Sequence, residues 1–481
     1  MIPVIDVFAG PGGLNEGFSR VVNAAGDPVF SIKGSFEMEA RAIETLRLRA
    51  AYRLFGETPR GLEMYKKFML GGGVDLEAEF PVEFAEAGRH VHQIQLGEQT
   101  RLESDELILK AVGEDPFVLV GGPPCQAYSL VGRARRRNDA KFHEDEKHFL
   151  FQEYLHILER FEPLIFVMEN VKGLLSATHS GFGMFERIKE DLELEGTYRI
   201  HSLVVEDDDP EPQDFVIRSE EYGVPQRRHR VILLGVHESL GDVRPTPLRK
   251  RAETVRFWEV LGDLPSLRSS LTKGDTEAAW QLAREVGLKT AQGKLSGERR
   301  AGLPDRSARS SDAEMLRDWL KIGSFPLAQH SSRRHMPDDV KRYAYYAAFL
   351  EHNQLRPRVD ELPQGLHPNH KNINGRTTPF ADRFWVQSWD EPSSTIVAHL
   401  SKDGHHFIHP DKSQARSLTV REAARLQTFP DDYWFCGPRT AQFQQVGNAV
   451  PPYLAHQIGA AVASLWGQRT QTLNDSARMS A

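Results

Sequence analysis

The chain of 481 residues is long enough for two or three domains, and its mix of 40% hydrophobic and 26% charged residues indicates a globular protein. No apolar run approaches the roughly 18 residues that a membrane span needs, and the first residues lack the features of a signal peptide, so we expect a cytoplasmic protein that does not contact a membrane. Two cysteines exclude a disulfide scaffold and a cysteine-rich zinc site, and the net charge of −7 gives no general attraction to nucleic acid.

Four short apolar runs before residue 240 have the composition of β-strands. They are continuous rather than alternating, which is typical of strands covered on both faces. Helical stretches lie between them, so the order of elements predicts an α/β fold with a parallel sheet wrapped by helices. The expected strands are residues 4–8, 117–120, 164–168 and 231–234, and the clearest helices are 42–54, 149–160 and 184–194.

The first expected strand runs directly into a glycine-rich loop, Phe-Ala-Gly-Pro-Gly-Gly at residues 8–13. Glycines in such a turn let the backbone approach a ligand closely. Glu37 and Glu39 follow at the expected end of a second strand, where a carboxylate can accept hydrogen bonds from both ribose hydroxyls of an adenosyl group. This pattern suits a nicotinamide cofactor and S-adenosylmethionine equally well.

Cys125 directly follows the second apolar run, in the loop Gly-Gly-Pro-Pro-Cys-Gln at residues 121–126. A lone cysteine is most often a small buried apolar residue, but here two prolines fix the backbone and present the thiol at a strand end. Glu169, in the Glu-Asn-Val after the third run, is a candidate proton donor. Because open parallel sheets bind ligands outside the carboxyl ends of their strands, all three clusters point to one crevice.

Beyond residue 241 turn formers and arginines become frequent, and we place a domain boundary near residue 243. Residues 241–310 carry 14 Lys and Arg against 9 Asp and Glu, a net charge of +5, and a second basic run at 133–137 follows the cysteine loop. Segregated positive charge permits a polyanionic partner, although such runs are often only solvated surface. Residues 42–112 are interpreted as a helix-rich insertion.

Near the end of the chain, Thr419 to Glu422 has the capping-box pattern of a helix start, and another helix is expected from Gln445 to about Trp466. The segment before Thr419 contains a cluster of polar side chains, namely His399, Asp403, His405, His406, His409 and Asp411. Because no cysteine assists and Gly404 indicates a turn, we expect a solvated hairpin here and no metal site.

Six sequence blocks, taken together and in order, resemble the cytosine-5 DNA methyltransferase family. Six blocks in the family's order across most of the chain are far more specific than any one of them. The region 244–415 resembles the family's target-recognition segment in position only. The blocks are 6–13 (DVFAGPGG), 122–126 (GPPCQ), 168–171 (MENV), 226–230 (QRRHR), 421–431 with its LQTFPD, and 445–452 (QVGNAVPP).

The resemblance implies a Rossmann-like methyltransferase sheet that binds S-adenosylmethionine, joined to a second, smaller target-recognition domain. The catalytic domain would comprise residues 1–243 and be completed by 440–469, with target recognition in 244–439. The implied reaction is methyl transfer from S-adenosylmethionine to C5 of a cytosine in a specific sequence of double-stranded DNA. A carbon inside a stacked duplex is unreachable, so the base is expected to be flipped out.

The resemblance also implies a role for each matching residue at the catalytic centre. Cys125 would attack C6 of the cytosine, and Glu169 would hydrogen-bond and protonate the ring at N3. Arg230, together with Arg228, would hold the base carbonyl or a nearby phosphate, work that suits a planar fork of donors. Asn170 would order the cysteine loop.

For the cofactor, the resemblance implies binding by Phe8, Gly10, Gly12, Gly13, Glu37, Met38 and Asn448. Since the family counterpart of Asn448 packs beside the first strand, we expect the final helix to return to the catalytic domain. The family often has an aromatic residue where Met38 stands, and no residue before Phe117 is assigned to adenine recognition.

Two other functions remain open. A tRNA cytosine-5 methyltransferase would use the same machinery, but those relatives usually have a shorter recognition region than residues 244–415 here. A catalytically silent DNA-binding regulator would not need Cys125, Glu169 and Arg230. The expected protein is therefore a monomeric DNA methyltransferase whose functional partner is a cognate restriction endonuclease.

Overall fold

The computed structural model describes residues 1–124, 150–176, 178–179, 182–294, 306–368 and 383–479. The chain divides into two compact units. Unit 1 comprises residues 1–222, 228–251 and 449–481, and unit 2 comprises residues 223–227 and 252–448. Unit 1 is therefore assembled from both ends of the polypeptide.

The unit boundaries lie at residues 251 and 448 rather than near the predicted residues 243 and 440. The segment after residue 243 stays with unit 1 because its backbone is bonded there: the amide of Leu248 donates to the carbonyl of Leu203, and that of Arg251 to Glu221, both at 2.8 Å. The assignment of unit 2 to target recognition stays a prediction.

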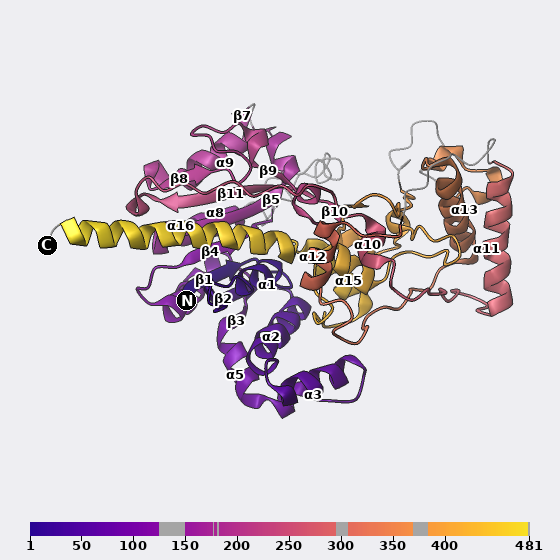
Figure 1. The fold of residues 1–481 in the computed structure, drawn as a ribbon, viewed down its shortest axis with the longest axis horizontal. Helices are drawn as coiled ribbons and strands as arrows, with labels where there is room; N and C mark the ends of the chain where they lie inside the picture. The colour runs from indigo at the N-terminus through magenta and orange to yellow at the C-terminus, as the bar shows by residue number, and fades with distance from the viewer. Residues whose placement is uncertain (125–149, 177, 180–181, 295–305, 369–382, 480–481) are drawn as a thin grey trace. The chain divides into compact units, whose positions relative to one another are not determined.

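Unit 1 contains an eight-stranded sheet in the order β3-β2-β1-β4-β5-β11-β8, with β9 beside β11 (Figure 1). Strands β1 to β5 are parallel, as predicted, but β11, which contains the fourth apolar run, is antiparallel to β5 and β8. A parallel neighbour needs a long crossover, whereas β11 follows closely on β9 and turns back against it. The strands are β1 (Ile2–Val7), β2 (Phe30–Glu37), β3 (Val91–Gln93), β4 (Val118–Gly121), β5 (Ile165–Val171), β8 (Tyr198–His201), β9 (Val216–Arg218) and β11 (His229–His237), and β6 (Thr178–His179) pairs with β7 (Phe182–Gly183) separately.

Helices pack on this sheet and bury its apolar strands. On one face, α6, α8 and α9 contribute apolar side chains such as Ile108, Leu158 and Ile188 to the core. Every residue of β4 is buried, which confirms that this apolar run is covered on both sides. The helices of unit 1 are α1 (Gly13–Ser19), α2 (Ala40–Phe55), α3 (Pro59–Met69), α4 (Leu76–Glu79), α5 (Pro81–His90), α6 (Arg101–Val112), α8 (Leu150–Phe161), α9 (Met184–Glu193) and α16 (Pro452–Met479).

The helix-rich segment 42–112 is not an insertion outside the sheet. It contains the expected helices, but it also contains β3, which pairs in parallel with β2 and forms the edge of the sheet. β3 has three residues, of which Val91 alone is buried, so it has no apolar run that could be recognised in the sequence. The segment therefore belongs to the doubly wound architecture itself.

Unit 2 is mainly helical and irregular. Helix α11 packs against α13, and the side chains of Trp280, Tyr343 and Tyr346 lie in their shared core. The buried face of α13 is therefore packed against α11. The helices are α10 (Phe257–Leu261), α11 (Glu277–Gln292), α12 (Ser311–Trp319), α13 (Pro337–Asn353), α14 (Val420–Leu426) and α15 (Arg439–Asn448), and the strands are β10 (Gln226–Arg227) and β12 (Ser393–Ser394).

Thr419 caps α14 with the predicted capping box: its hydroxyl accepts from the Glu422 amide, and the Glu422 carboxylate accepts from the Thr419 amide at 2.7 Å.

The single helix expected from Gln445 is instead two helices, α15 and α16, because Pro451 and Pro452 carry no N–H to continue the first. No helix of the described residues is both long and apolar enough to cross a lipid bilayer.

Candidate active site

The carboxyl ends of β1, β4 and β5 lie next to one another at one edge of the sheet. The three strands are adjacent and parallel, with Val7 paired to Gly121 and Gly121 paired to Met168. This confirms the expectation that the clusters following these strands meet at one edge. Cys125 follows β4 but lies outside the described residues.

Glu169 and two arginines form a charged cluster at this edge. Glu169 Oε1 lies 2.7 Å from Arg230 Nε, and both side chains are largely buried. Arg228 is almost fully buried, and this burial, followed by the nearby charge of Arg230, lowers the pKa of its guanidinium to about 9. The Arg228 guanidinium therefore stays charged at neutral pH.

The loop that leads to Cys125 is held against the end of β5. Asn170 Nδ2 donates to the Pro123 carbonyl at 3.4 Å, and its Oδ1 accepts from the Val171 amide at 2.8 Å. Gly122 lies against Glu169, since a Cβ added to Gly122 would be 3.1 Å from Glu169 Oε2. The glycine therefore permits the close approach of the loop to this carboxylate.

The glycine loop after β1 has left-handed backbone at three residues: Phe8 (φ 56°), Gly10 (φ 55°) and Gly12 (φ 90°). This conformation is easy for glycine and costly for Phe8. The Gly10 amide donates to Glu37 Oε2 at 2.8 Å, which joins the loop to the end of β2. No described atom lies within 4 Å of a Cβ added to Gly10, so the loop is open on this side.

Glu37 is fixed by three backbone amides. Its Oε2 accepts from Gly10, and its Oε1 accepts from Met38 and Glu39, both at 2.9 Å. Burial raises the pKa of the Glu37 carboxyl, and these hydrogen bonds offset only part of that effect. Because each carboxylate oxygen can accept two hydrogen bonds, Oε2 retains the capacity to accept one more.

Gln93 is a candidate site residue that the sequence analysis missed. β3 places it opposite Glu37 in the parallel pair, and its Nε2 donates to the Met38 carbonyl at 3.4 Å. The side chains of Gln93 and Met38 are both exposed, that of Met38 by 49%. No signal in the sequence marks Gln93, because β3 has only three residues and only Val91 among them is buried.

Gly13 is buried against the start of α16. A Cβ added to Gly13 would lie 2.1 Å from the Val450 carbonyl oxygen, and one added to Gly17 would lie 2.4 Å from Ala455 Cβ. The missing side chains therefore let α1 and α16 pack closely, which confirms that the final helix returns to the unit that contains β1. Gly13 thus has a packing role, whatever it contributes to a ligand.

Asn448 is the last residue of α15, and its side chain is exposed. The preceding Gly447 packs against residues 397–398, since an added Cβ would lie 2.2 Å from the Ala398 amide nitrogen. Asn448 belongs to unit 2, whereas the glycine loop and Glu37 belong to unit 1. The role of Asn448 in cofactor binding therefore stays a prediction.

The prediction of a solvated hairpin around Gly404 is wrong. The His405 ring is buried, stacks on Phe384 and hydrogen-bonds through Nδ1 to the Tyr343 hydroxyl at 2.6 Å. His409 is buried as well. The chain turns at Gly404, as expected, but the segments on either side form short 3-10 turns instead of a hairpin, and in them Leu400, His405 and Phe407 are buried while His399 is exposed. No group of three or more His, Cys, Asp or Glu side chains among the described residues is arranged to hold a metal ion.

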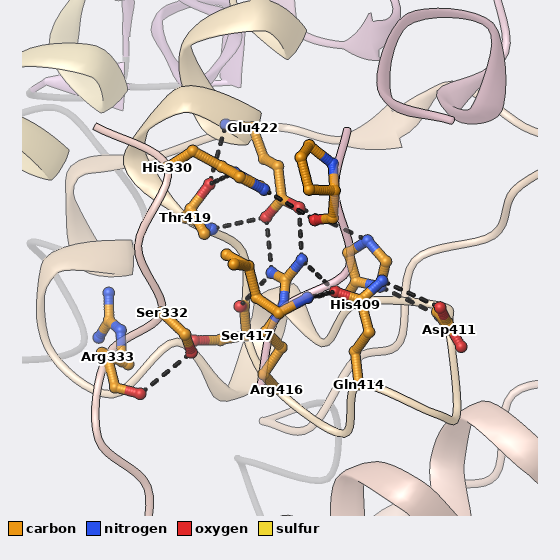
Figure 2. Close-up of polar contacts among 12 residues, drawn as sticks. His330, Ser332, Arg333, His409, Asp411, Gln414, Arg416, Ser417, Thr419 and Glu422 are labelled. Carbon is orange, nitrogen blue, oxygen red and sulfur yellow. Dashed lines mark hydrogen bonds and ion pairs between the residues drawn. The ribbon is translucent and has the colours of Figure 1, made fainter. Parts of the chain in front are cut away.

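The buried network around His409 is centred on one ion pair. The guanidinium of Arg416 donates to both carboxylate oxygens of Glu422, at 2.7 and 2.8 Å, and neither residue is exposed (Figure 2). His409 Nε2 lies 3.6 Å from Glu422 Oε1, yet burial, followed by the charge of Arg416, lowers the pKa of the imidazole to about 3. This network is therefore structural, because it holds α14 in unit 2.

Comparison with known proteins decides the family. The model of the C-5 cytosine-specific DNA methylases matches residues 92–464. The type II methyltransferase M.Bpa9945I of Bacillus paralicheniformis is 33% identical, over 95% of this chain and 98% of its own length. The chain belongs to the C-5 cytosine-specific DNA methylases.

Two further matches agree with this. The type II methyltransferase M.AgeI of Thalassovita gelatinovora is 30% identical, over 72% of this chain and 82% of its own length. The crystal structure of an Escherichia coli protein, described as a DNA modification methyltransferase encoded within a prophage, matches with a TM-score of 0.55 and 19% identity. It covers 97% of this chain and 100% of the other, which supports the methyltransferase fold of this DNA cytosine-5 methyltransferase.

A DNA cytosine-5 methyltransferase needs a methyl donor, and the residues at the ends of β1 and β2 fit an adenosyl compound. Gly10 leaves one side of the loop open, so a ligand can approach the backbone there. Glu37 is held in place by the loop itself and can still accept a hydroxyl at Oε2. Both features are those that a ribose-bearing methyl donor requires.

Proposed function

We propose that this DNA cytosine-5 methyltransferase transfers a methyl group from S-adenosylmethionine to C5 of cytosine in a specific sequence of double-stranded DNA. The reaction proceeds through a covalent bond between Cys125 and C6 of a base flipped out of the duplex. The observation that carries this proposal is the position of Glu169, whose carboxylate lies against Gly122 of the cysteine loop and 2.7 Å from Arg230.

The chemistry gives Cys125 and Glu169 complementary tasks. C5 of cytosine is too weak a nucleophile to attack a methyl group unaided. The Cys125 thiolate forms a bond to C6 while protonated Glu169 gives its proton to N3, which turns the ring into an enamine with a nucleophilic C5. After C5 is methylated, it loses its proton to a base, and expulsion of the thiolate restores the C5–C6 double bond while N3 returns its proton to Glu169.

The arginines support both steps. A thiol of ordinary pKa, about 8.5, is mostly protonated at neutral pH, and neighbouring positive charge favours the thiolate. Arg230 and Arg228 supply that charge and offer donors for the base carbonyl or a nearby phosphate. Asn170 keeps the backbone before Cys125 in place through its bond to Pro123.

S-Adenosylmethionine, when bound, supplies an electrophilic methyl group. The residues proposed to hold it are Phe8, Gly10, Gly12 and Gly13 of the loop, Glu37 for the ribose hydroxyls, Met38 for the adenine face, and Asn448. Gln93 joins them, because its exposed amide beside Met38 can donate to and accept from the edge of a purine.

The relatives' names support a role in restriction and modification, since M.Bpa9945I and M.AgeI are both called type II methyltransferases. The enzyme acts as a monomer and protects DNA from a cognate endonuclease, with unit 2 reading the target sequence. Expression in a host without cytosine methylation, followed by genome-wide mapping of 5-methylcytosine, identifies that sequence. Methylation scattered without a common sequence would contradict this role.

Methyl transfer in vitro tests the reaction. Purified protein is incubated with S-adenosylmethionine carrying a labelled methyl group and with duplex DNA, tRNA or no nucleic acid. Label in DNA alone is expected, label in tRNA would favour the RNA enzyme, and label in neither would contradict the proposal. DNA with 5-fluorocytosine at the target should trap the wild-type protein covalently, because C5 has no proton to lose, and Cys125→Ser should abolish the trapped complex.

A further inference from the structure

Three segments of unit 2 carry positive charge and no negative charge. Residues 326–336, 392–402 and 433–448 contain four Lys or Arg residues and no Asp or Glu. The chain as a whole has 67 Asp and Glu against 60 Lys and Arg, so positive charge is segregated in these segments. The four basic residues are Arg333, Arg334, Lys402 and Arg439, and none of the roles proposed above uses them.

The three segments pack against one another. Arg333, in the first segment, donates through both Nη atoms to backbone carbonyls of the second, at 2.7 and 3.2 Å. Its guanidinium also lies over the ring of Phe443 in α15, 4.5 Å from the ring centroid. Arg439, at the start of α15, donates to the Ser331 hydroxyl at 3.3 Å. The four basic residues therefore belong to one region of unit 2.

Three of the four basic side chains are exposed. They are Arg334, Lys402 and Arg439, which together we call the basic surface, whereas Arg333 is half-buried beneath them. Within the described ranges, no hydrogen bond or ion pair engages the side chain of Arg334 or Lys402. These charged groups are therefore available to an anionic partner.

The acidic residues that border the three segments are already paired. Asp403 directly follows Lys402, and its carboxylate accepts from Arg383 at 2.8 Å. On α13, Asp338 and Asp339 each pair with a basic residue three positions further along the same helix. The positive charge of the basic surface is therefore not cancelled by these neighbours.

We propose that the basic surface binds backbone phosphates of duplex DNA and so holds the substrate on unit 2 without reading its sequence. This rests on the proposed function and extends it, because it names residues that hold the duplex. Separate exposed cations suit the repeated phosphates of a polyanion, and each contact releases a counterion. Helix α15 also ends at Asn448, about 15 Å from Arg439 along its axis, so the basic surface begins near a residue proposed for the cofactor.

Arg334→Gln, Lys402→Gln and Arg439→Gln each remove one charge from an exposed side chain. Each should weaken duplex binding about 5- to 10-fold at about 0.1 M salt and lower the slope of log K against log salt by about 0.9. The triple variant should lower that slope by about 2.7. Fluorescence anisotropy of the full-length protein with a duplex of mixed sequence measures both, since phosphate contacts carry no sequence information.

Lys289→Gln on α11 is the matched control. Its side chain is 77% exposed in the same unit, and the change removes the same charge outside the three segments. It should bind DNA as the wild type does. Arg334→Lys should keep most of the affinity, because lysine also binds phosphate as a point charge. An equal loss for Lys289→Gln, or unchanged binding by the triple variant, would overturn the proposal.

Steady-state methylation distinguishes this proposal from the proposed function. The triple variant should have a raised KM for DNA, with kcat at saturating DNA and the affinity for S-adenosylhomocysteine at wild-type values. A lowered kcat with an unchanged KM for DNA would overturn the assignment to DNA binding. A wild-type enzyme that methylates no nucleic acid would refute the proposed function, while the anisotropy measurement would still decide whether the basic surface binds DNA.

Discussion

Glu169 and Arg230 face each other from the neighbouring strands β5 and β11, with 2.7 Å between carboxylate Oε1 and guanidinium Nε. The pair is largely buried, and the carboxylate also lies against Gly122. One acid is thus fixed between the loop that leads to the proposed nucleophile, Cys125, and the arginine proposed to hold the base. This arrangement makes the role of Glu169 open to a direct test.

Glu169→Gln should abolish most of the methyl transfer. A glutamine cannot give a proton to N3 and cannot pair with Arg230, so we expect the single-turnover rate to fall by about 10²- to 10⁴-fold. Binding of S-adenosylmethionine should be unaffected. Glu186→Gln on the exposed side of α9 is the control and should keep the wild-type rate. A wild-type rate for Glu169→Gln would remove it from the mechanism.

Glu37→Gln should weaken cofactor binding. In the variant, an NH2 group replaces one of the two carboxylate oxygens. This donor then faces a backbone N–H that donates to the carboxylate oxygen in the wild-type protein. A lost charged hydrogen bond of about 1.5–3 kcal/mol corresponds to about 10- to 100-fold in the dissociation constant. Titration calorimetry with S-adenosylhomocysteine measures it. Glu39→Gln, two residues away and exposed, should bind normally, and equal affinities for the two variants would contradict the assignment.

Gly13→Ala should destabilise unit 1. The added Cβ would lie 2.1 Å from the Val450 carbonyl oxygen, so α1 and α16 must move apart, at a cost of about 1–3 kcal/mol. Gly88→Ala in α5 is the matched control, because nothing lies within 4 Å of its added Cβ. It should be neutral or stabilise by about 0.5–1 kcal/mol. Urea unfolding of both variants measures the difference, and equal stabilities would show that the helices do not pack as described.

Unit 2 should lose stability in mild acid because of His335 and His409. Burial is the main cause that lowers the pKa of each to about 3, against about 6.5 when unfolded. Above pH 6.5 both states are neutral, and as pH falls from 6.5 toward 3 the unfolded state binds protons that the folded state excludes. The loss is about 2 kcal/mol per histidine at pH 5.

Urea unfolding at pH 7.5 and pH 5 measures this loss, in a range where carboxylates with ordinary pKa values stay ionised. His335 Nε2 accepts from the Ser417 amide, and a glutamine can offer an acceptor in its place. His335→Gln should therefore lose less stability between the two pH values than the wild type. An identical loss would mean that His335 does not titrate in the way its burial implies.

The sequence was informative wherever one local pattern decides the structure. The continuous apolar runs marked β1, β4 and β5, and the polar residues that follow them share one edge, because parallel strands end on the same side. The Thr419 capping box is equally local and equally correct. The antiparallel direction of β11 could not be predicted from its sequence, because an apolar run has the same composition whether the strand is parallel or antiparallel to its neighbour.

Other features depend on contacts between distant segments. Gly13 resembles a ligand-binding glycine, yet its neighbour is Val450, and nothing in the sequence reports that proximity. Gln93 becomes a site residue only because β3 pairs beside Glu37. His405 and His409 resemble solvated residues in a polar segment, but aromatic and ion-paired neighbours from elsewhere in unit 2 bury them.

The close packing of α1 and α16 has a consequence for the order of synthesis. In the chain α1 precedes unit 2 and α16 follows it, so during synthesis the surface of α1 shaped by Gly13 and Gly17 has no partner until unit 2 has been made. A chain interrupted before Val450 already contains Cys125, Glu169 and Arg230 but cannot close the unit that should position them. Unit 1 can therefore reach the packing described here only after α16 has been synthesised.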